Sequence, residues 1–349
     1  MKGLATCLLA ACGALSAASD PPVRGIHLMA PKPDEVPAAV LFITEELPKF
    51  GVNLLVLEVD YRYSFTKRPE AAERDALSRE DMRKFAGACR RAGIRLIPQI
   101  SMLGHQSWAK STGALLRAHP EFDETPGAYP GNEGIYCRSY CPLHPQVHEV
   151  VFDLMDELAE ACEADAVHVG MDEVFLIGEK ECPRCRGKSK ADLFAQEVRT
   201  LHNYLAQSKR QMWMWGDRFL DSETTGIHKW EASANFTYDA VRQVPRDIVI
   251  CDWHYEMAHP TAVWFALEGF PVVSAPWRKA PAALGLLELM RGVRANAGEA
   301  VANRMLGMLQ TTWGSFGSLL RAYQGDPAAD PRMLEVMGCM KKMFAPVNP

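Results

Sequence analysis

Eight short apolar runs, separated by longer segments with helical periodicity, constrain the fold of this chain more than any other feature. Apolar residues predominate in the runs and do not alternate regularly with polar ones, which is typical of parallel strands buried on both faces of a sheet. A strand and then a helix, repeated eight times, predict an α/β fold of the (β/α)8 or TIM barrel class; its usual ~250 residues leave room for long loops. The predicted strands are residues 24–29, 53–59, 94–100, 165–171, 211–215, 247–253, 271–275 and 305–311.

Helix boundary signals support this alternation of strands and helices. Ser78 and Asp81 have the spacing of a capping box at the start of one predicted helix, and Gly93 closes that helix. Gly51 and Gly269 close two others in the same way. The alternative fold, an open doubly wound sheet, would be favoured by a glycine-rich phosphate-binding turn after the first strand, and the sequence has no such turn there.

The first residues of the chain predict export. Residues 1–19 combine one lysine, a short apolar run and small residues, which is the layout of a secretory signal peptide. Cleavage before Cys12 would give a lipoprotein, whereas the small residues after it suit an ordinary signal peptidase, and both remain open. We predict one barrel domain over residues 20–349, located in the periplasm, outside the cell or on a lipid anchor, with no transmembrane segment in the mature chain.

The charge balance argues against some classes of partner. The formal net charge is -5 and the isoelectric point is near 6.1, and we find no basic run. The chain therefore lacks the positive surface expected of a protein that binds nucleic acid or an anionic membrane. A small neutral substrate fits this balance better.

Two pairs of closely spaced cysteines stand out in a chain that we expect to be exported. Cys137 and Cys141 form one pair, and Cys182 and Cys185 form the other. Together they could make two disulfides or a four-thiolate zinc site, and the spacing leaves both open. We predict a structural role for them and no catalytic metal, because no histidine or carboxylate stands at ligand spacing beside them.

Chemically distinctive residues follow the predicted strands, where a barrel gathers its active site. Asp172 and Glu173 follow the fourth run, and His105 lies in a long irregular stretch, residues 104–145, after the third. Aromatic faces pack on the C–H faces of sugars and carboxylates bind hydroxyls, so we predict a carbohydrate site. Any one of the aromatic rings at these strand ends could simply fill the core, but core packing does not explain five of them at corresponding positions. The later strand ends carry Trp215, Asp217, Trp253, Tyr255, Trp277 and Trp313.

The segment "HVGMDEV" at residues 168–174 resembles the His-x-Gly-Gly-Asp-Glu signature of glycoside hydrolase family 20, the β-N-acetylhexosaminidases, with Met171 in place of the second glycine. The resemblance covers nearly the whole mature chain. "RGIHL" is similar to the family's opening strand, "MLGHQSW" to its Gly-His loop and "CPLHPQVHEVVFDLMDEL" to the helix before the signature. "MWGDRF", "APWRK" and "TTWGSF" stand where the family has sugar-stacking tryptophans.

The resemblance implies a (β/α)8 barrel and substrate-assisted hydrolysis, in which the 2-acetamido oxygen of the sugar attacks the anomeric carbon with net retention. Asp172 would orient the acetamido group, and Glu173 would act as general acid and then general base. Successive strand residues point to opposite sides, so we expect the two carboxylates to have different targets. No cofactor is implied. The implied substrate-binding residues are Arg24 at the C3 and C4 hydroxyls, Trp215, Trp253, Trp277 and Trp313 as pocket walls, Tyr255 at the acetamido carbonyl, Asp217, and His105 and His168 in supporting roles.

Two departures from the family pattern keep alternatives open. Ser315 stands where the family commonly has a carboxylate for outer hydroxyls, so the preference between N-acetylglucosaminides and N-acetylgalactosaminides is open. Met171 narrows the space expected behind the carboxylates, which would suit altered specificity or a catalytically silent sugar-binding barrel. A metal-dependent hydrolase is disfavoured, because the first predicted strand offers only one histidine, His27.

Overall fold

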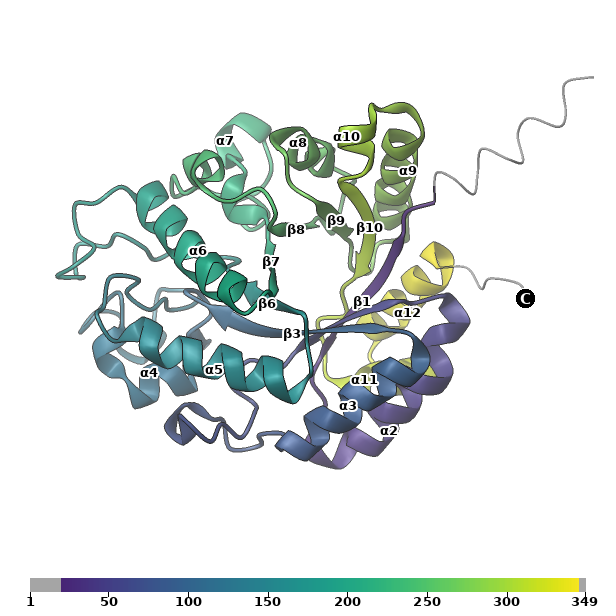
Figure 1. Cartoon of the computed structure of the whole chain (residues 1–349), viewed down its shortest axis with the longest axis horizontal. Helices are drawn as coiled ribbons and strands as arrows, with labels where there is room; N and C mark the ends of the chain where they lie inside the picture. The colour runs from purple at the N-terminus through teal and green to yellow at the C-terminus, as the bar shows by residue number, and fades with distance from the viewer. Residues whose placement is uncertain (1–19, 345–349) are drawn as a thin grey trace, which may run out of the picture.

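The computed structural model describes residues 20–344, which form one closed barrel of eight parallel strands (Figure 1). The strands follow the order β1, β2, β3, β6, β7, β8, β9 and β10, and β10 pairs with β1 to close the barrel. Each coincides with a predicted run, so the predicted (β/α)8 fold is confirmed. The strands are β1 Val23–Met29, β2 Leu54–Glu58, β3 Arg95–Met102, β6 Ala166–Gly170, β7 Gln211–Trp215, β8 Val249–Trp253, β9 Val272–Ala275 and β10 Met305–Gln310.

Side chains alternate between two apolar layers along each strand, as period-two geometry requires. In β7, Trp215 points into the barrel, whereas Met214 packs in the layer between strands and helices. Gly25 of β1 faces inward, since a Cβ added there would lie 2.9 Å from the inward-facing side chain of Leu309. This parity decides which strand residues can reach a site inside the barrel.

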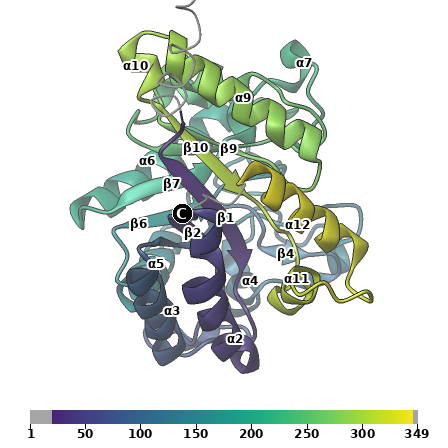
Figure 2. The same ribbon diagram turned by 90° about the vertical axis from the view of Figure 1, so that its right-hand side faces the viewer.

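Helices form the outer layer of the barrel. Figure 2 shows α9, α11 and α12 packed together on the flank next to β1 and β10. A two-stranded hairpin, β4 Ser107–Trp108 and β5 Ser111–Thr112, lies within the long loop after β3. The α-helices are α2 Val36–Leu41, α3 Arg79–Ala92, α4 Ala114–Ala118, α5 Val147–Ala161, α6 Lys190–Gln207, α7 Ser222–Thr225, α8 Thr261–Glu268, α9 Ala280–Asn296, α10 Glu299–Ala302, α11 Phe316–Tyr323 and α12 Pro331–Met343.

The predicted helix boundary signals have the expected geometry. The Ser78 hydroxyl accepts the N–H of Asp81 at 3.1 Å, and the Asp81 carboxylate accepts the N–H of Ser78 at 3.1 Å, which completes a capping box at the start of α3. Gly93, Gly51 and Gly269 all end helical segments with φ between 64° and 104°. A positive φ is easiest for glycine, which explains why glycine marks these ends.

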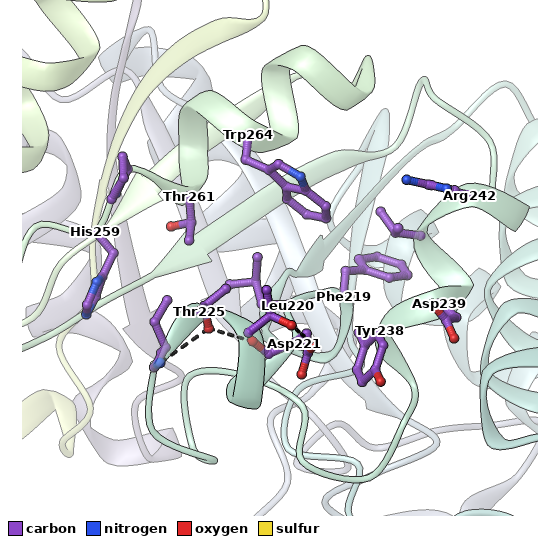
Figure 3. Close-up of a pocket in the computed structure, with 14 residues that line it drawn as sticks. Phe219, Leu220, Asp221, Thr225, Tyr238, Asp239, Arg242, His259, Thr261 and Trp264 are labelled. Carbon is purple, nitrogen blue, oxygen red and sulfur yellow. Dashed lines mark hydrogen bonds between the residues drawn. The ribbon is translucent and has the colours of Figure 1, made fainter.

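The helical layer is interrupted between β7 and β8, against the prediction of one helix per strand. The short α7 and the 3-10 helix Tyr238–Gln243 take the place of a long helix there. Beside them lies a groove of about 540 Å³, drawn in Figure 3, with Phe219, Thr261 and Trp264 in its wall. None of the site residues predicted from the sequence lines this groove, so we place the candidate active site elsewhere.

Behind β8, close to this groove, His254 is buried among acidic groups. Its Nδ1 lies 2.8 Å from an oxygen of Glu231, and its Nε2 lies 2.6 Å from the hydroxyl of Thr261 and 3.3 Å from an oxygen of Asp252. Burial by itself would lower the pKa of His254, but the charge of Asp252 and the contacts with both carboxylates raise it to about 9. The imidazolium is therefore the form that the folded protein stabilises.

This buried imidazolium predicts a loss of stability at alkaline pH. Because the pKa of His254 is raised in the folded state, its contribution is fully present below the unfolded-state value near 6.5 and is lost as the pH rises through about 9. The expected contribution is on the order of 3 kcal/mol. Urea unfolding of the native chain and of His254→Gln between pH 6 and pH 9.5 measures it: the native free energy of unfolding should fall more steeply. Parallel curves would contradict the assignment.

The sequence predicts an N-terminal signal peptide and no transmembrane segment in the mature chain. The predicted signal peptide, residues 1–19, lies outside the described residues, so export stays a prediction. Within residues 20–344, no helix combines the length and the apolar character needed to cross a bilayer.

Candidate active site

The paired carboxylates lie just beyond the end of β6, on backbone that has left the extended conformation. Gly170, Met171 and Glu173 have φ values of 67°, 71° and 49°, in the left-handed region. Gly170 is required here, because a Cβ would lie 3.0 Å from the Cα of Ser101 on β3. The expectation that Asp172 and Glu173 point to opposite sides as strand residues is therefore wrong: the turn brings both carboxylates to one side.

His105, in the loop after β3, is the group to which both carboxylates turn. Its Nε2 lies 3.2 Å from Oδ2 of Asp172 and 3.3 Å from Oε2 of Glu173. Burial would lower the pKa of His105, but the charge of Asp172 and the two close carboxylates raise it well above its ordinary value. Conversely, burial would raise the pKa of Asp172, and the charge of His105 instead holds it below its usual range. Both shifts favour an ionised Asp172 beside a cationic His105.

The two oxygens of the Asp172 carboxylate differ. Oδ2 faces His105, whereas Oδ1 is buried and has no hydrogen-bond partner among residues 20–344. A buried carboxylate oxygen without a partner is costly, so it is a position where a ligand N–H would be stabilised. The side chain of Glu173 is 12% exposed and therefore reachable from solvent.

Asp217, in the 3-10 helix Asp217–Phe219 after β7, positions the backbone of Glu173. Its Oδ2 accepts the N–H of Glu173 at 2.9 Å and Nε of Arg218 at 2.6 Å, and its Oδ1 accepts the indole N–H of Trp253 at 3.2 Å. Burial, with the nearby charge of Asp172, raises the pKa of Asp217 to about 6 even though Arg218 opposes the shift. These contacts occupy the carboxylate that we expected to bind substrate, which makes Asp217 a positioning residue.

The predicted aromatic residues form one continuous wall. The ring of Trp215 lies 5.6 Å from that of Trp313, whose indole N–H donates to the hydroxyl of Tyr255. Tyr255 in turn lies 4.9 Å from Trp253 and 5.5 Å from Trp277, centroid to centroid. Five residues from four different strand ends therefore meet, as the barrel hypothesis requires.

His168 lies beneath this wall, inside the barrel. Its ring is 4.7 Å from that of Trp215, and its Nδ1 accepts the N–H of Gly170 at 3.2 Å. Burial, reinforced by the nearby His27, lowers the pKa of His168 to about 3. Through this hydrogen bond, His168 supports the turn that carries the carboxylates.

Arg24 does not lie at this site. It is the second residue of β1, so it lies at the N-terminal end of the barrel, and the parity of the strand turns its side chain outward. There it pairs with Asp20 at 3.4 Å, in a crevice shared with Leu287 of α9 and Met343 of α12. The predicted role at the C3 and C4 hydroxyls does not fit this position.

Two residues that contact the site, His27 and Tyr136, were not predicted from the sequence. His27 faces inward from β1, with its Nε2 2.9 Å from an oxygen of Glu58 and its ring 4.6 Å from that of Trp313. Period-two parity along β1 could have identified it. Tyr136, whose ring lies 5.9 Å from that of His105 and 4.8 Å from that of Trp230, comes from the long irregular loop, where no sequence period could have phased it.

Of the four cysteines that could have shared one site, the structure brings three together. The sulfur of Cys141 lies 3.4 Å from that of Cys182 and 3.5 Å from that of Cys185. Cys137 is not part of this group, because its thiol points to the carbonyl oxygen of Glu173 at 3.7 Å. Cys137 and Cys141 lie on the same irregular segment, so their spacing alone did not fix the directions of their side chains.

Residues 55–279 match the profile of the glycosyl hydrolase family 20 catalytic domain. A β-hexosaminidase of Emericella nidulans is 26% identical over 57% of this chain and 32% of its own length, so the matched region spans about a third of that relative. The chain belongs to glycosyl hydrolase family 20, as the resemblance of "HVGMDEV" predicted.

Solved structures agree on the fold. A β-N-acetylhexosaminidase of Bacteroides fragilis superimposes with a TM-score of 0.64 at 18% identity, covering 94% of this chain and 68% of that one. An exo-β-N-acetylglucosaminidase of Vibrio harveyi, solved in complex with N-acetylglucosamine, has a TM-score of 0.62 at 16% identity, covering 92% of this chain and 54% of that one. At these identities the likeness establishes the shared barrel.

Proposed function

We propose that the protein is a retaining exo-β-N-acetylhexosaminidase that hydrolyses terminal 2-acetamido-2-deoxy-β-hexosides by substrate-assisted catalysis. One observation carries the proposal: Asp172 faces His105 at 3.2 Å through Oδ2 and keeps its other oxygen, Oδ1, buried without a hydrogen-bond partner among residues 20–344. The N–H of a 2-acetamido group could supply the hydrogen-bond donor that this oxygen lacks. Family membership supports the same substrate class.

In the proposed first step, the acetamido oxygen attacks the anomeric carbon while the bond to the leaving oxygen breaks. Positive charge then develops on the oxazolinium ring, and the Asp172 carboxylate stabilises it at the ring N–H. His105, whose Nε2 lies 3.2 Å from Oδ2 of Asp172, would stabilise the ionised form of Asp172 in this step. No protein nucleophile takes part, and the sugar is never bonded to the chain.

Glu173 handles the proton in both proposed steps. It donates a proton to the leaving oxygen in the first step and accepts one from the water that opens the oxazolinium ring in the second. The hydrogen bond from its N–H to Asp217 fixes the backbone that carries this side chain. The aromatic wall of Trp215, Trp253, Tyr255, Trp277 and Trp313 would pack against the sugar ring.

The alternative, a catalytically silent sugar-binding barrel, rested on Met171 in place of the family's glycine. Met171 is fully buried and belongs to the same apolar cluster as Met102 and Val174, so its side chain is part of the packed core. We favour the active enzyme, because both carboxylates are present and face a common histidine.

A panel of aryl β-glycosides tests the proposed function. We expect turnover of the N-acetylglucosaminide or the N-acetylgalactosaminide, and a kcat/KM for the matched glucoside lower by about tenfold or more, because a 2-hydroxyl offers neither the nucleophile nor the N–H. Equal rates on the glucoside and its 2-acetamido counterpart would overturn substrate assistance. Binding of N-acetylglucosamine without turnover of any glycoside would instead identify the silent barrel.

A further inference from the structure

Three buried thiols meet beside the candidate active site at distances that suit a metal ion better than a disulfide. The sulfur of Cys141 lies 3.4 Å from that of Cys182 and 3.5 Å from that of Cys185. A disulfide bond would bring two sulfurs to about 2.05 Å. Four ligands held tetrahedrally on zinc by bonds of about 2.3 Å place the sulfurs roughly 3.8 Å apart. The observed spacing is much nearer to the second value.

An odd number of thiols also argues against disulfides. Three cysteines cannot all pair with one another, and the neighbouring Cys137 faces the carbonyl oxygen of Glu173 instead. Any disulfide within the group would therefore leave one buried thiol alone. A metal ion uses all three sulfurs and requires one further ligand to complete a tetrahedron.

Glu124 supplies a fourth donor. It is fully buried, its Oε1 accepts the N–H of Glu179 at 3.2 Å, and its Oε2 has no hydrogen-bond partner among residues 20–344. One oxygen of Glu124 and the three sulfurs all lie within 4.8 Å of one another. A buried carboxylate is stabilised when it is paired or when it coordinates a metal, and the thiols alone offer no positive charge.

The backbone of the Cys182–Cys185 turn is arranged to support thiolates. The N–H of Cys185 points to the sulfur of Cys182 at 3.4 Å, and the N–H of Arg186 donates to the carbonyl oxygen of Cys182 at 3.2 Å. The turn continues through Gly187 with φ 77°. Donors aimed at ligand sulfurs are the supporting contacts that metal sites use to stabilise thiolate charge.

We propose that Glu124, Cys141, Cys182 and Cys185 bind one zinc ion in a closed, structural site. Soft thiolates in a four-ligand set favour zinc among the common divalent ions, and four protein ligands leave no open position for substrate or water. The site is distinct from the His105, Asp172 and Glu173 group, with which it shares no residue.

The proposed ion would link the two loops that build the candidate active site. Glu124 and Cys141 belong to the loop after β3, which also carries His105, whereas Cys182 and Cys185 belong to the loop after β6, which carries Asp172 and Glu173. A bond through the metal would fix these loops relative to each other, as a cross-link between distant parts of the chain does. The zinc proposal does not depend on the proposed reaction.

Metal analysis of the purified full-length chain tests the site directly. We expect one zinc per chain, thiolate-to-metal charge-transfer absorption after exchange with Co²⁺, and a lower unfolding temperature after treatment with a chelator. Cys182→Ser should lose the metal, whereas the control Cys137→Ser should retain it. The spectroscopic test uses the native chain, so it stands even if a cysteine variant fails to fold.

The fourth ligand needs its own variants. Glu124→Gln should weaken zinc binding by more than the roughly 10- to 100-fold typical for loss of a supporting group, and Glu124→Cys should restore tight binding as a four-thiolate site. Stoichiometric zinc that survives in Glu124→Gln with unchanged affinity would overturn the assignment of Glu124. A native chain without metal, in which mass spectrometry finds two of the three thiols joined in a disulfide, would overturn the site as a whole.

Discussion

Glu173→Gln should lower kcat/KM for an N-acetylhexosaminide with a poor leaving group by about 10²- to 10⁴-fold, the range typical of losing a general acid. The amide has the shape of the acid but cannot deliver the proton that the leaving oxygen requires. The penalty should be smaller on aryl glycosides whose leaving groups depart without protonation. Steady-state kinetics over a series of aryl leaving groups measures this dependence.

A matched control separates catalysis from folding in this experiment. Glu288→Gln makes the same chemical change on the outer helix α9, where the side chain of Glu288 is 75% exposed, and should leave the kinetics unchanged. Thermal unfolding of both variants should resemble that of the native chain. A loss for Glu173→Gln that is equal on every leaving group would show that Glu173 is not the proton donor.

Asp172→Asn should reduce kcat/KM by a similar 10²- to 10³-fold, typical of removing one group that stabilises transition-state charge, but alike on good and poor leaving groups. The positive charge on the acetamido nitrogen develops whichever aglycone departs, and a neutral amide cannot stabilise it. In addition, the variant should lose most of its preference for 2-acetamido sugars over glucosides. The same aryl series, run on both sugars, measures the two effects.

Asp165→Asn is the matched control for this second experiment. Asp165 immediately precedes β6, at the opposite end of that strand from Asp172, and its exposed side chain pairs with Arg95 at 2.9 Å. Its replacement should change stability slightly and catalysis not at all. If the loss in Asp172→Asn were confined to poor leaving groups, the acid would be Asp172 and the proposed roles would have to be exchanged.

The barrel could be predicted from the sequence because its strands are buried on both faces and are therefore mostly apolar. Such runs can be recognised in the sequence without knowing which strands pair. The interruption between β7 and β8 could not be predicted. Residues 216–248 replace a helix with short turns whose stability comes from distant hydrogen bonds, such as that of Asn235 with the carbonyl of Val174 at 2.8 Å. Contacts of this kind leave no period in the sequence.

The candidate site shows the same division. Asp172, Glu173, His105 and the tryptophans could be predicted because they follow strands, and the barrel then brings strand ends together. Arg24 was misplaced because its assignment followed a motif resemblance, whereas strand parity and its position at the start of β1 send it outward. Glu124 gave no signal at all, since a single carboxylate in an irregular loop has no spacing that marks it as a ligand.

Arg218 stabilises the segment between β7 and β8, where a long outer helix is missing, through hydrogen bonds instead of apolar packing. Its fully buried guanidinium bonds Asp217 and the carbonyl oxygens of Lys229, Trp230 and Ala232, at 2.6 to 3.1 Å. An apolar helix face can exchange one hydrophobic residue for another and lose little, because packing tolerates swaps of similar volume. The several hydrogen bonds of the planar Arg218 guanidinium cannot be replaced in this way, because lysine does not reproduce the geometry of a guanidinium. Among relatives that share this interruption, position 218 should therefore change slowly in sequence. The apolar positions of the outer helices should change more readily.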